Sequence, residues 1–257
     1  METSKRVVIV TGAARGIGRA IAEAFAANGD QPILCDLDLE NAEKSAVEIA
    51  GKFACRAAAK RLDVADAADV ERLIDQTVRE WGRIDVIVNN AGLQHVDPIE
   101  NFPVEKWDLL IGVMLKGPFL LTKYAIPHMK QRQFGRIINI SSVHGKTASP
   151  FKAAYVSAKH GVVGLTRTAA LETANDNITV NAVMPGTVRT SLIENQLQKL
   201  AENDGTTREE ALQRHLLAKQ ALKRFIKPEE VAACCVFLAS EQAAAITGET
   251  ISVSGGW

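Results

Sequence analysis

VIVTGAARGIG, residues 8–18, joins an apolar strand pattern to a turn that contains Gly12, Gly16 and Gly18. Glycine allows a tight turn between a strand and a helix, and it lets backbone N–H groups approach a bound anion closely. The helix that starts near Gly16 and Ile17 would add free N–H groups and the positive end of its dipole. This stretch therefore predicts a strand, a turn and a helix arranged around a phosphate group.

The alternation of short apolar runs and longer helical patterns continues through all 257 residues. Strands are expected at 6–10, 32–36, 56–63, 85–90, 136–141, 178–183 and 250–255. Helical patterns lie between them, for example at Ile17–Asn28, Asp66–Trp81 and Ala153–Glu172. Several strands are apolar almost throughout, which is typical of a parallel sheet covered on both faces. We expect an α/β fold, with a single domain over residues 1–257 and a doubly wound parallel sheet of about seven strands.

One segment interrupts this alternation after the sixth expected strand. Residues from about 190 to 224 are polar and helical in character, and they contain no strand pattern. A long excursion from a compact sheet often covers a site, so we expect a helical lid here. The alternative is an insertion that packs on its own domain or contacts another subunit.

Composition and charge limit the classes of function. The chain has 30 basic and 30 acidic residues and a formal net charge of zero, which disfavours nucleic acid as a partner. No apolar run in the sequence reaches the length of a membrane span, and the first residues lack the apolar core of a secretory signal. The four cysteines form no CxxC pair and the five histidines form no HExxH pattern, so no metal site is expected. We expect a cytoplasmic protein without a membrane partner.

Acidic residues at strand ends suggest which cofactor the glycine turn serves. Asp36 closes the second expected strand, where a carboxylate can accept hydrogen bonds from the adenine ribose and repel a 2′-phosphate. Arg15 in the turn could bind a phosphate, which favours NADP, or it could point to solvent. Asp63, at the end of the third strand, could meet the adenine or could cap the following helix. We rank Asp36 above Arg15 and expect NAD.

The stretch AYVSAK, residues 154–159, places Tyr155 and Lys159 one helical turn apart on one face. Taken alone, such a pair is usually surface decoration. The other motifs change this interpretation, because together they resemble those of the short-chain dehydrogenase/reductase family. The likeness extends over the whole chain and rests on TGAARGIG (11–18), DV (63–64), NNAG (89–92), Ser142, YVSAK (155–159), PGTVRT (185–190) and SGGW (254–257).

The resemblance implies a Rossmann-like fold and assigns the catalytic residues. Tyr155 would be the catalytic acid/base, Lys159 its partner and a ligand of the nicotinamide ribose, and Ser142 a hydrogen-bond donor to the substrate oxygen. A free phenol has a pKa of about 10 and is protonated at neutral pH. A nearby ammonium and the positive nicotinamide favour the phenolate, so we expect a lowered pKa for Tyr155.

The resemblance also implies further cofactor contacts. Val64 would accompany Asp63, and Asn90 would lie near a ribose, although it could instead be a turn former. The Val188 backbone and the Thr190 hydroxyl would lie near the nicotinamide amide. Members of the family are usually tetramers, and the apolar C-terminal ISVSGGW suits a subunit contact, so we expect a homotetramer.

Residues 135–166 and 193–197 are more specifically similar to the bacterial D-3-hydroxybutyrate dehydrogenases within that family. In those enzymes two glutamines, a histidine and a lysine hold the substrate carboxylate. The matching positions are Gln94, His144, Lys152 and Gln196. One positive charge with neutral or titratable donors suits a small carboxylate, so we expect (R)-3-hydroxybutyrate and acetoacetate. Taken singly, His144 could be a loop residue, Lys152 a solvated helix start and Gln196 exposed surface.

Two positions depart from the pattern of those enzymes. Thr187 stands where they commonly have Trp, which would widen the pocket at the methyl end of the substrate. Met114 stands where the family has an Asn that helps a water to reach the lysine. Two alternatives therefore stay open: a related enzyme acting on another hydroxy acid, a hydroxyacyl compound or a polyol, and a catalytically weak NAD-binding scaffold.

Overall fold

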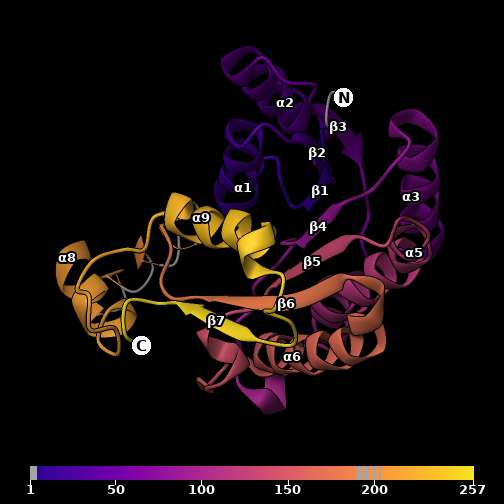
Figure 1. Ribbon diagram of the computed structural model, residues 1–257. Helices are drawn as coiled ribbons and strands as arrows, with labels where there is room; N and C mark the ends of the chain where they lie inside the picture. The colour runs from indigo at the N-terminus through magenta and orange to yellow at the C-terminus, as the bar shows by residue number, and fades with distance from the viewer. Residues whose placement is uncertain (1–4, 190–192, 194–196, 199–200, 203) are drawn as a thin grey trace.

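The computed structural model describes residues 5–257 except 190–192, 194–196, 199–200 and 203. Its centre is one parallel sheet of seven strands in the order β3-β2-β1-β4-β5-β6-β7 (Figure 1). The strands are β1 (Val7–Thr11), β2 (Gln31–Asp36), β3 (Ala58–Arg61), β4 (Val86–Asn89), β5 (Gly135–Ile140), β6 (Ile178–Pro185) and β7 (Thr250–Val253). The order reverses between β1 and β4, and a crevice at the carboxyl ends of the strands is expected at such a point. The predicted seven-stranded parallel sheet is confirmed.

Helices cover both faces of the sheet (Figure 1). They are α1 (Gly16–Ala27), α2 (Leu39–Phe53), α3 (Ala67–Trp81), α4 (Val104–Ile111), α5 (Gly117–Arg132), α6 (Ala153–Thr173), α8 (Arg208–Ala211) and α9 (Pro228–Leu238). Val8 and Val10 of β1 pack with α1, α2 and α9, whereas Val7 and Ile9 pack with α3, α5 and α6. Alternate residues of one strand thus enter two different cores, which explains why the strands are apolar throughout.

Most expected boundaries agree with the structure to within a few residues. The third strand is two residues shorter than expected at each end, because it spans Ala58–Arg61 rather than 56–63. It lies at the edge of the sheet and pairs with β2 alone, over four residues. Helix α3 begins directly after Asp66, whose side chain accepts hydrogen bonds from the N–H groups of Ala68 and Asp69. Asp66 is therefore the N-cap, and the alternative that gave this role to Asp63 is wrong.

Helices α4 and α5 are joined by the π-helical turn η2 (Gly112–Lys116) into one helix from Val104 to Arg132. This helix is long and apolar enough to cross a membrane on length and composition alone, so the expectation that no stretch reaches this length is wrong. Half of its most apolar window is buried inside the protein. Leu120, Leu121 and Ala125 belong to the core on the α3 and α6 face, so the packing of this helix accounts for its hydropathy.

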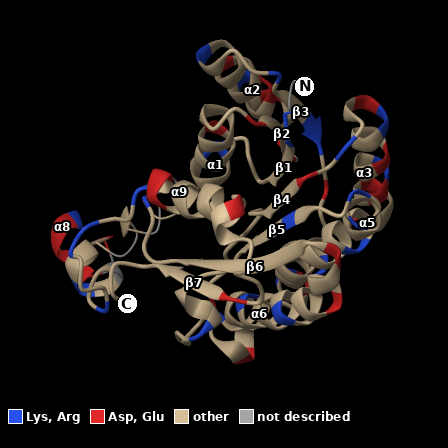
Figure 2. Ribbon diagram, viewed as in Figure 1, with Lys and Arg blue, Asp and Glu red and all other residues tan. Residues whose placement is uncertain are grey.

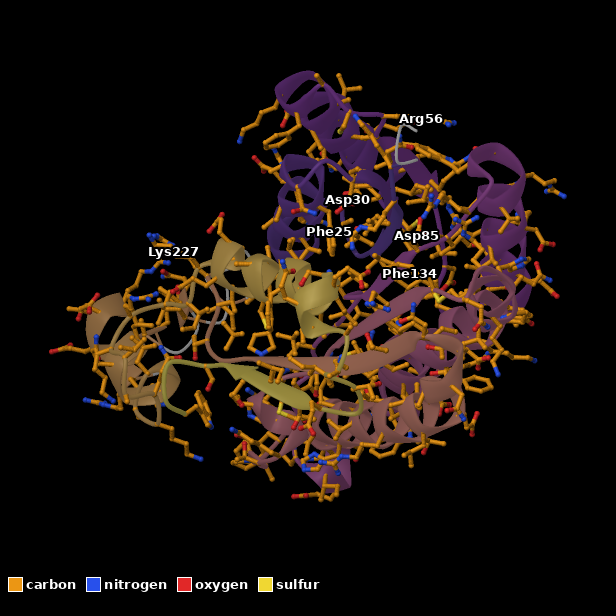
Figure 3. The ribbon with its side chains drawn as sticks, viewed as in Figure 1. Phe25, Asp30, Arg56, Asp85, Phe134 and Lys227 are labelled. Carbon is orange, nitrogen blue, oxygen red and sulfur yellow. The ribbon has the colours of Figure 1, made fainter. Side chains whose placement is uncertain are left out.

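Ion pairs and hydrogen bonds hold the amino edge of the sheet, where Asp30 and Asp85 lie (Figure 3). Asp30 pairs with Arg6 at 2.8 Å, just before β2 begins. Asp85, just before β4, pairs with Arg83 and accepts a hydrogen bond from the N–H of Val7 at 2.8 Å. These residues lie at the opposite ends of the strands from the glycine turn. They fix the sheet and leave its carboxyl edge for a site.

The segment after β6 leaves the sheet and returns at a narrow neck. Val188 and Ile226 form an isolated parallel bridge, and the N–H of Ile226 donates to the carbonyl of Thr187 at 2.8 Å. The buried amide of Gln220 accepts from the N–H of Thr187 and donates to the carbonyls of Leu222 and Arg224. Beyond this neck, the described residues include α8, the π-helical turn η5 (Leu212–Leu216) and a small apolar cluster around Leu197, Ala211 and Leu217. Closure of this segment as a lid stays a prediction.

Candidate active site

A cavity of about 410 Å³ opens at the carboxyl edge of the sheet. Its lining contains most of the predicted cofactor and catalytic residues, namely Gly12, Arg15, Gly16, Ile17, Asp36, Asp63, Val64, Asn90, Ser142, Tyr155, Lys159 and Val188. These residues come from seven separate parts of the chain, which the sheet brings to one edge. Thr190 and Gln196 lie outside the described residues, so their predicted roles stay predictions.

The glycine turn has the conformation that an anion site needs. Gly12 and Gly16 have φ angles of +63° and +59°, in a region that favours glycine. A Cβ atom at Gly12 would lie 2.8 Å from the Cα atom of Ala91. No side chain caps the start of α1, so its first N–H groups face the cavity without a capping oxygen. Gly18 does not line the cavity; a Cβ there would lie 2.2 Å from the carbonyl oxygen of Gly12, so it serves close packing instead.

Asp36 is held rigidly at the adenine end of the cavity. Its Oδ2 accepts a hydrogen bond from the N–H of Ala14 at 2.9 Å, and its Oδ1 accepts one from the N–H of Asp38 at 3.0 Å. Arg15 is mostly exposed and its Nη2 lies 3.5 Å from Oδ2 of Asp38. The one cation of the glycine turn is therefore already near a carboxylate, which weakens the signal for a 2′-phosphate.

Two further cofactor candidates have defined hydrogen bonds. Asp63 accepts from the N–H of Ala65 at 2.9 Å, which orients its carboxylate at the cavity wall. The side-chain Nδ2 of Asn90 donates to the carbonyls of Thr11 and Gly12 at 2.9 and 3.0 Å. Asn90 therefore ties β4 to the glycine turn in addition to lining the cavity.

The structure brings Ser142, Tyr155 and Lys159 together at the other end of the cavity. Lys159 is 5% exposed, and its Nζ donates to the carbonyl of Ile140 at 2.7 Å and lies 5.7 Å from the centre of the Tyr155 ring. Burial lowers the pKa of Lys159 to about 8. Burial raises the pKa of Tyr155, and its hydrogen bond with Ser142 only partly opposes that rise. The expected lowering of the pKa of Tyr155 is thus wrong for the polypeptide alone, because the loss of hydration outweighs the opposing effect of Ser142.

His144 is buried, and both of its ring nitrogens have partners. Its Nδ1 lies 3.3 Å from Oγ of Ser142, and its Nε2 lies 2.8 Å from Oγ of Ser149. Burial lowers the pKa of His144 to about 4, helped by the charges of Lys152, Lys219 and His160. The imidazole is therefore neutral at pH 7, and the contact of His144 with a substrate carboxylate stays a prediction.

Lys152 precedes α6 and is partly buried. Burial lowers the pKa of Lys152, and its ammonium has no hydrogen-bond or ion-pair partner among the residues that the structure describes. A solvated helix start is therefore not what the structure shows. Gln94 does not line the cavity, and its Oε1 accepts a hydrogen bond from the N–H of His95 at 3.1 Å.

Sequence reasoning missed two aromatic contacts of this end of the site. The centre of the Trp257 ring lies 6.0 Å from the centre of the His144 ring. The centre of the Tyr155 ring lies 5.8 Å from the centre of the same His144 ring, in an edge-to-face arrangement. The terminal SGGW was visible in the sequence, but a contact across more than a hundred residues leaves no local signal. Ser149 was missed because a single serine between loop residues carries no pattern.

Met114 occupies the position at which the family has an Asn, and its thioether is buried. Met114 is 1% exposed and lies within η2, where the N–H of Gly117 donates to the carbonyl of Gly112 five residues earlier. Its Sδ would lie 3.7 Å from a Cβ placed on Gly92, so the side chain packs against the NNAG loop. Turns of this kind are frequent at functional sites. Thr187, the second departure, is also buried.

Comparison with known proteins agrees with this geometry. The family described as enoyl-(acyl carrier protein) reductase matches residues 12–257. The chain is 45% identical over 253 residues to the uncharacterized oxidoreductase YxjF of Bacillus subtilis, covering 98% of each chain. It is 41% identical over 252 residues to a D-beta-hydroxybutyrate dehydrogenase of Cupriavidus necator, covering 98% of this chain and 97% of the other. It is 39% identical over 256 residues to the 3-oxoacyl-[acyl-carrier-protein] reductase FabG of Thermotoga maritima, covering 100% and 99%.

These similarities extend almost from end to end and include both the glycine turn and the residues around Tyr155. The parallel sheet, the cavity at its switch point and the buried Tyr155–Lys159 pair are the structural counterparts of those motifs. The chain therefore belongs to the short-chain dehydrogenase/reductase family of NAD(P)-dependent oxidoreductases.

Proposed function

We propose that the protein is an NAD-dependent oxidoreductase that interconverts (R)-3-hydroxybutyrate and acetoacetate. The observation that carries this proposal is Lys152, a partly buried ammonium that has no hydrogen-bond or ion-pair partner among the described residues and lies near enough to His144 to lower its pKa. An unpaired buried cation is costly unless a ligand supplies the negative charge. A short carboxylate whose hydroxyl reaches Tyr155 would supply it.

The geometry of the cavity fits a nicotinamide dinucleotide. The turn at Gly12 and Gly16 and the uncapped start of α1 suit a pyrophosphate, and Asp36 suits an adenine ribose without a 2′-phosphate. Val188 and, by family resemblance, Thr190 would hold the nicotinamide amide. When bound, NAD supplies the acceptor for the hydride that leaves the alcohol carbon.

The side chains at the inner end of the cavity would handle the alcohol proton. Tyr155, as the phenolate, would remove the proton from the substrate hydroxyl while Ser142 holds the same oxygen. Lys159 lies on the same face of α6 as Tyr155 and would stabilise that phenolate. Its ammonium is held in place by a hydrogen bond to the carbonyl of Ile140 at the end of β5. The raised pKa of Tyr155 in the polypeptide alone favours the neutral phenol, which is the form that ketone reduction requires.

Recognition of the carboxylate would centre on Lys152. Gln94 and Gln196 would donate further hydrogen bonds to the carboxylate, as the resemblance to the D-3-hydroxybutyrate dehydrogenases implies. The neutral His144 would form a polar wall of the substrate site. The buried Thr187 would leave room beyond the methyl group of the substrate, so slightly longer 3-hydroxy acids are expected to be accepted.

A second candidate comes from the 39% identity to the 3-oxoacyl-[acyl-carrier-protein] reductase. Such a substrate is a thioester and carries no carboxylate next to its ketone. It would leave Lys152 unpaired, which is why the hydroxy acid is preferred here. A catalytically weak scaffold is disfavoured because Ser142, Tyr155 and Lys159 are all in place.

Steady-state assays decide between these functions. NAD reduction should be followed with both enantiomers of 3-hydroxybutyrate, with longer 3-hydroxy acids and with 2-butanol, and NADH and NADPH oxidation with an acetoacetyl thioester. The proposal expects the highest kcat/KM for an (R)-3-hydroxy acid with NAD. A higher kcat/KM for the thioester with NADPH would overturn it.

We also propose a cytoplasmic homotetramer. Several large apolar side chains of α4 and its surroundings are exposed, as subunit contacts require: Ile99, Val104, Trp107, Leu109 and Phe119.

All four cysteines are free thiols, which suits a reducing compartment. Lys and Arg alternate with Asp and Glu on the outer helices α2 and α3, a pattern without the basic stripe of a nucleic-acid-binding surface (Figure 2). Light scattering after gel filtration would test the tetramer, and a monomeric mass would refute it.

A further inference from the structure

Two serines contact the imidazole of His144 from opposite sides. Nδ1 of the ring lies 3.3 Å from Oγ of Ser142, and Nε2 lies 2.8 Å from Oγ of Ser149. The imidazole is buried, and the rings of Tyr155 and Trp257 pack against it with their centres 5.8 and 6.0 Å from its own. This packing holds the ring in one orientation, in which each nitrogen faces one serine hydroxyl.

The position of the ring proton decides which serine donates. The imidazole is neutral at pH 7, so it carries a single N–H and a single lone pair. If the proton is on Nε2, the ring donates to Ser149 and accepts the hydroxyl proton of Ser142. If the proton is on Nδ1, the ring donates to Ser142 and accepts the hydroxyl proton of Ser149. The two arrangements therefore differ in where the one hydroxyl proton of Ser142 points.

We propose that Ser149 is a positioning residue, whose hydroxyl donates to Nε2 of His144, keeps the ring proton on Nδ1 and so leaves the Ser142 hydroxyl free for the substrate oxygen. The proposal rests on the proposed function, because it needs Ser142 to hold the oxygen on which charge develops. It gives His144 a positioning role in place of the predicted contact with the substrate carboxylate, since both ring nitrogens are then occupied. Ser149 acquires a role that neither the motifs nor the family resemblance gives it.

The hydrogen bonds around Ser142 support this arrangement. A serine hydroxyl has one proton and two acceptor sites. The backbone N–H of His144 donates to Oγ of Ser142 at 3.2 Å, which fills one acceptor site. With the ring proton on Nδ1, the second site is filled as well, and the hydroxyl proton is left for the cavity that Ser142 lines. With the ring proton on Nε2, the same hydroxyl proton would point to Nδ1, and the substrate oxygen would lose its donor.

The surroundings of Ser149 suit the role of donor. Its contact with Nε2 is shorter than the contact of Ser142 with Nδ1. Among the residues that the structure describes, His144 is the one hydrogen-bond partner of Ser149 Oγ. Ser149 is also partly exposed, so water can reach the acceptor sites of the hydroxyl while its proton points to the ring. A donor held 2.8 Å from Nε2 disfavours a proton on that nitrogen, because one hydrogen bond holds one proton.

Kinetics of Ser149→Ala test the proposal, with Ser149→Thr and Thr147→Val as controls. Without the donor the ring proton can occupy Nε2, and Nδ1 then competes for the Ser142 hydroxyl. We expect kcat to fall about tenfold for 3-hydroxybutyrate and for 2-butanol alike, with KM changed less than about twofold. Ser149→Thr keeps a hydroxyl and should retain most of the activity. Thr147→Val removes a hydroxyl of the same loop that donates to the carbonyl of Val143, so it should match the unmodified protein.

A double-mutant cycle with Ser142→Ala separates positioning from a loss of structure. Ser142→Ala removes the donor to the substrate oxygen and should lower kcat by about 100-fold or more. Once that hydroxyl is absent, the position of the ring proton no longer affects the substrate oxygen. Adding Ser149→Ala to Ser142→Ala should therefore lower kcat no further. If Ser149→Ala lowers kcat by the same factor in both backgrounds, the role of Ser149 is structural and the proposal is overturned.

¹⁵N NMR of the imidazole tests the proposal without turnover. The ring proton should be on Nδ1 in the unmodified protein at pH 7 and should move to Nε2 in Ser149→Ala. A ring proton on Nε2 in the unmodified protein would overturn the proposal, and so would a Ser149→Ala variant that raises KM for the hydroxy acid alone, because His144 would then bind the carboxylate. If the unmodified protein oxidises no alcohol, the proposed function fails and the positioning role fails with it. The NMR result distinguishes that failure from a wrong placement of the ring proton.

Discussion

Oδ2 of Asp36 accepts the backbone N–H of Ala14 at 2.9 Å, so the last side chain of β2 is hydrogen-bonded to the glycine turn after β1. The N–H of Asp38 fixes the other carboxylate oxygen. The negative charge therefore cannot swing away from the place where a 2′-phosphate would lie. We propose that this rigidity makes the carboxylate of Asp36 a selector for NAD over NADP.

Asp36→Ala should relax the preference for NAD. Removing the fixed charge removes the clash with a 2′-phosphate, so the ratio of kcat/KM for NAD over NADP should fall at least about tenfold. The measurement is steady-state kinetics with both cofactors at saturating substrate. Equal kcat/KM for the two cofactors in the unmodified protein would show that Asp36 is not a selector.

Lys152→Met should weaken binding of hydroxy acids specifically. The loss of a charge-assisted hydrogen bond costs about 1.5–3 kcal/mol, which corresponds to a KM roughly 10- to 150-fold higher. KM for 2-butanol should change little. Lys146→Met is the matched control, because Lys146 lies in the same loop and donates to Ser252 instead. Equal losses for the acid and the alcohol would remove Lys152 as the anchor.

Acid should destabilise the protein through His144. Its pKa is about 4 in the folded protein against 6.5 for a free imidazole, so the unfolded chain binds a proton more readily. Unfolding therefore becomes easier as the pH falls from about 6.5 to about 4, by up to ~3 kcal/mol. Above pH 7 the ring is neutral in both states and contributes nothing to this dependence.

Urea unfolding at pH 7.5 and at pH 4.5 would measure that effect, with His144→Gln as the comparison. The free energy of unfolding of the variant should fall less on acidification than that of the unmodified protein. Because the ring stays neutral, KM for a hydroxy acid should show no inflection from His144 between pH 5.5 and 8. An inflection near pH 6.5 that disappears in His144→Gln would contradict both expectations.

Met114→Asn should leave KM nearly unchanged and raise kcat modestly or not at all. The protein is expected to be active with Met114, since Ser142, Tyr155 and Lys159 are all in place and a backbone carbonyl of η2 can accept a water instead of the amide. Steady-state kinetics of the two proteins with 3-hydroxybutyrate provide the test. Inactivity of the unmodified protein toward every hydroxy acid, followed by rescue in Met114→Asn, would show that the amide is required.

Hydrogen exchange should detect closure of the segment after β6. Amides between residues 190 and 217 should exchange more slowly when NADH and a carboxylate analogue are added together, with the largest change around Gln196. Helix α9 serves as an internal reference away from the cavity. Unchanged exchange in the segment would favour the alternative of a packing or subunit-contact insertion.

The periodicity of apolar residues and the spacing of the motifs in the sequence predicted most of the architecture. Val7 to Val10 are all apolar because they supply two cores, and the same pattern in the other central strands predicted the parallel sheet. The glycine spacing predicted the turn, and the interval from Tyr155 to Lys159 predicted their shared helix face. These signals are local in the chain, so one sequence suffices to read them.

The remaining features depend on surroundings that the sequence does not display. The pKa of Tyr155 is raised by its burial, which outweighs the opposing effect of Ser142. The contact of Trp257 with His144 depends on where β7 ends relative to β5. Asp63 and Asp66 are equally plausible caps in sequence, and only the backbone shows that Asp66 holds the start of α3.

The neck beneath the segment after β6 has a consequence for protein engineering. Thr187 and Val188 are fastened to Ile226 and to the amide of Gln220, so the outgoing and returning strands are joined before the segment begins. Residues 190–219 can therefore be exchanged as a cassette between two fixed ends. If the segment covers the substrate, as proposed, a library built there would vary the choice of substrate, while Val188 kept its position at the cofactor cavity.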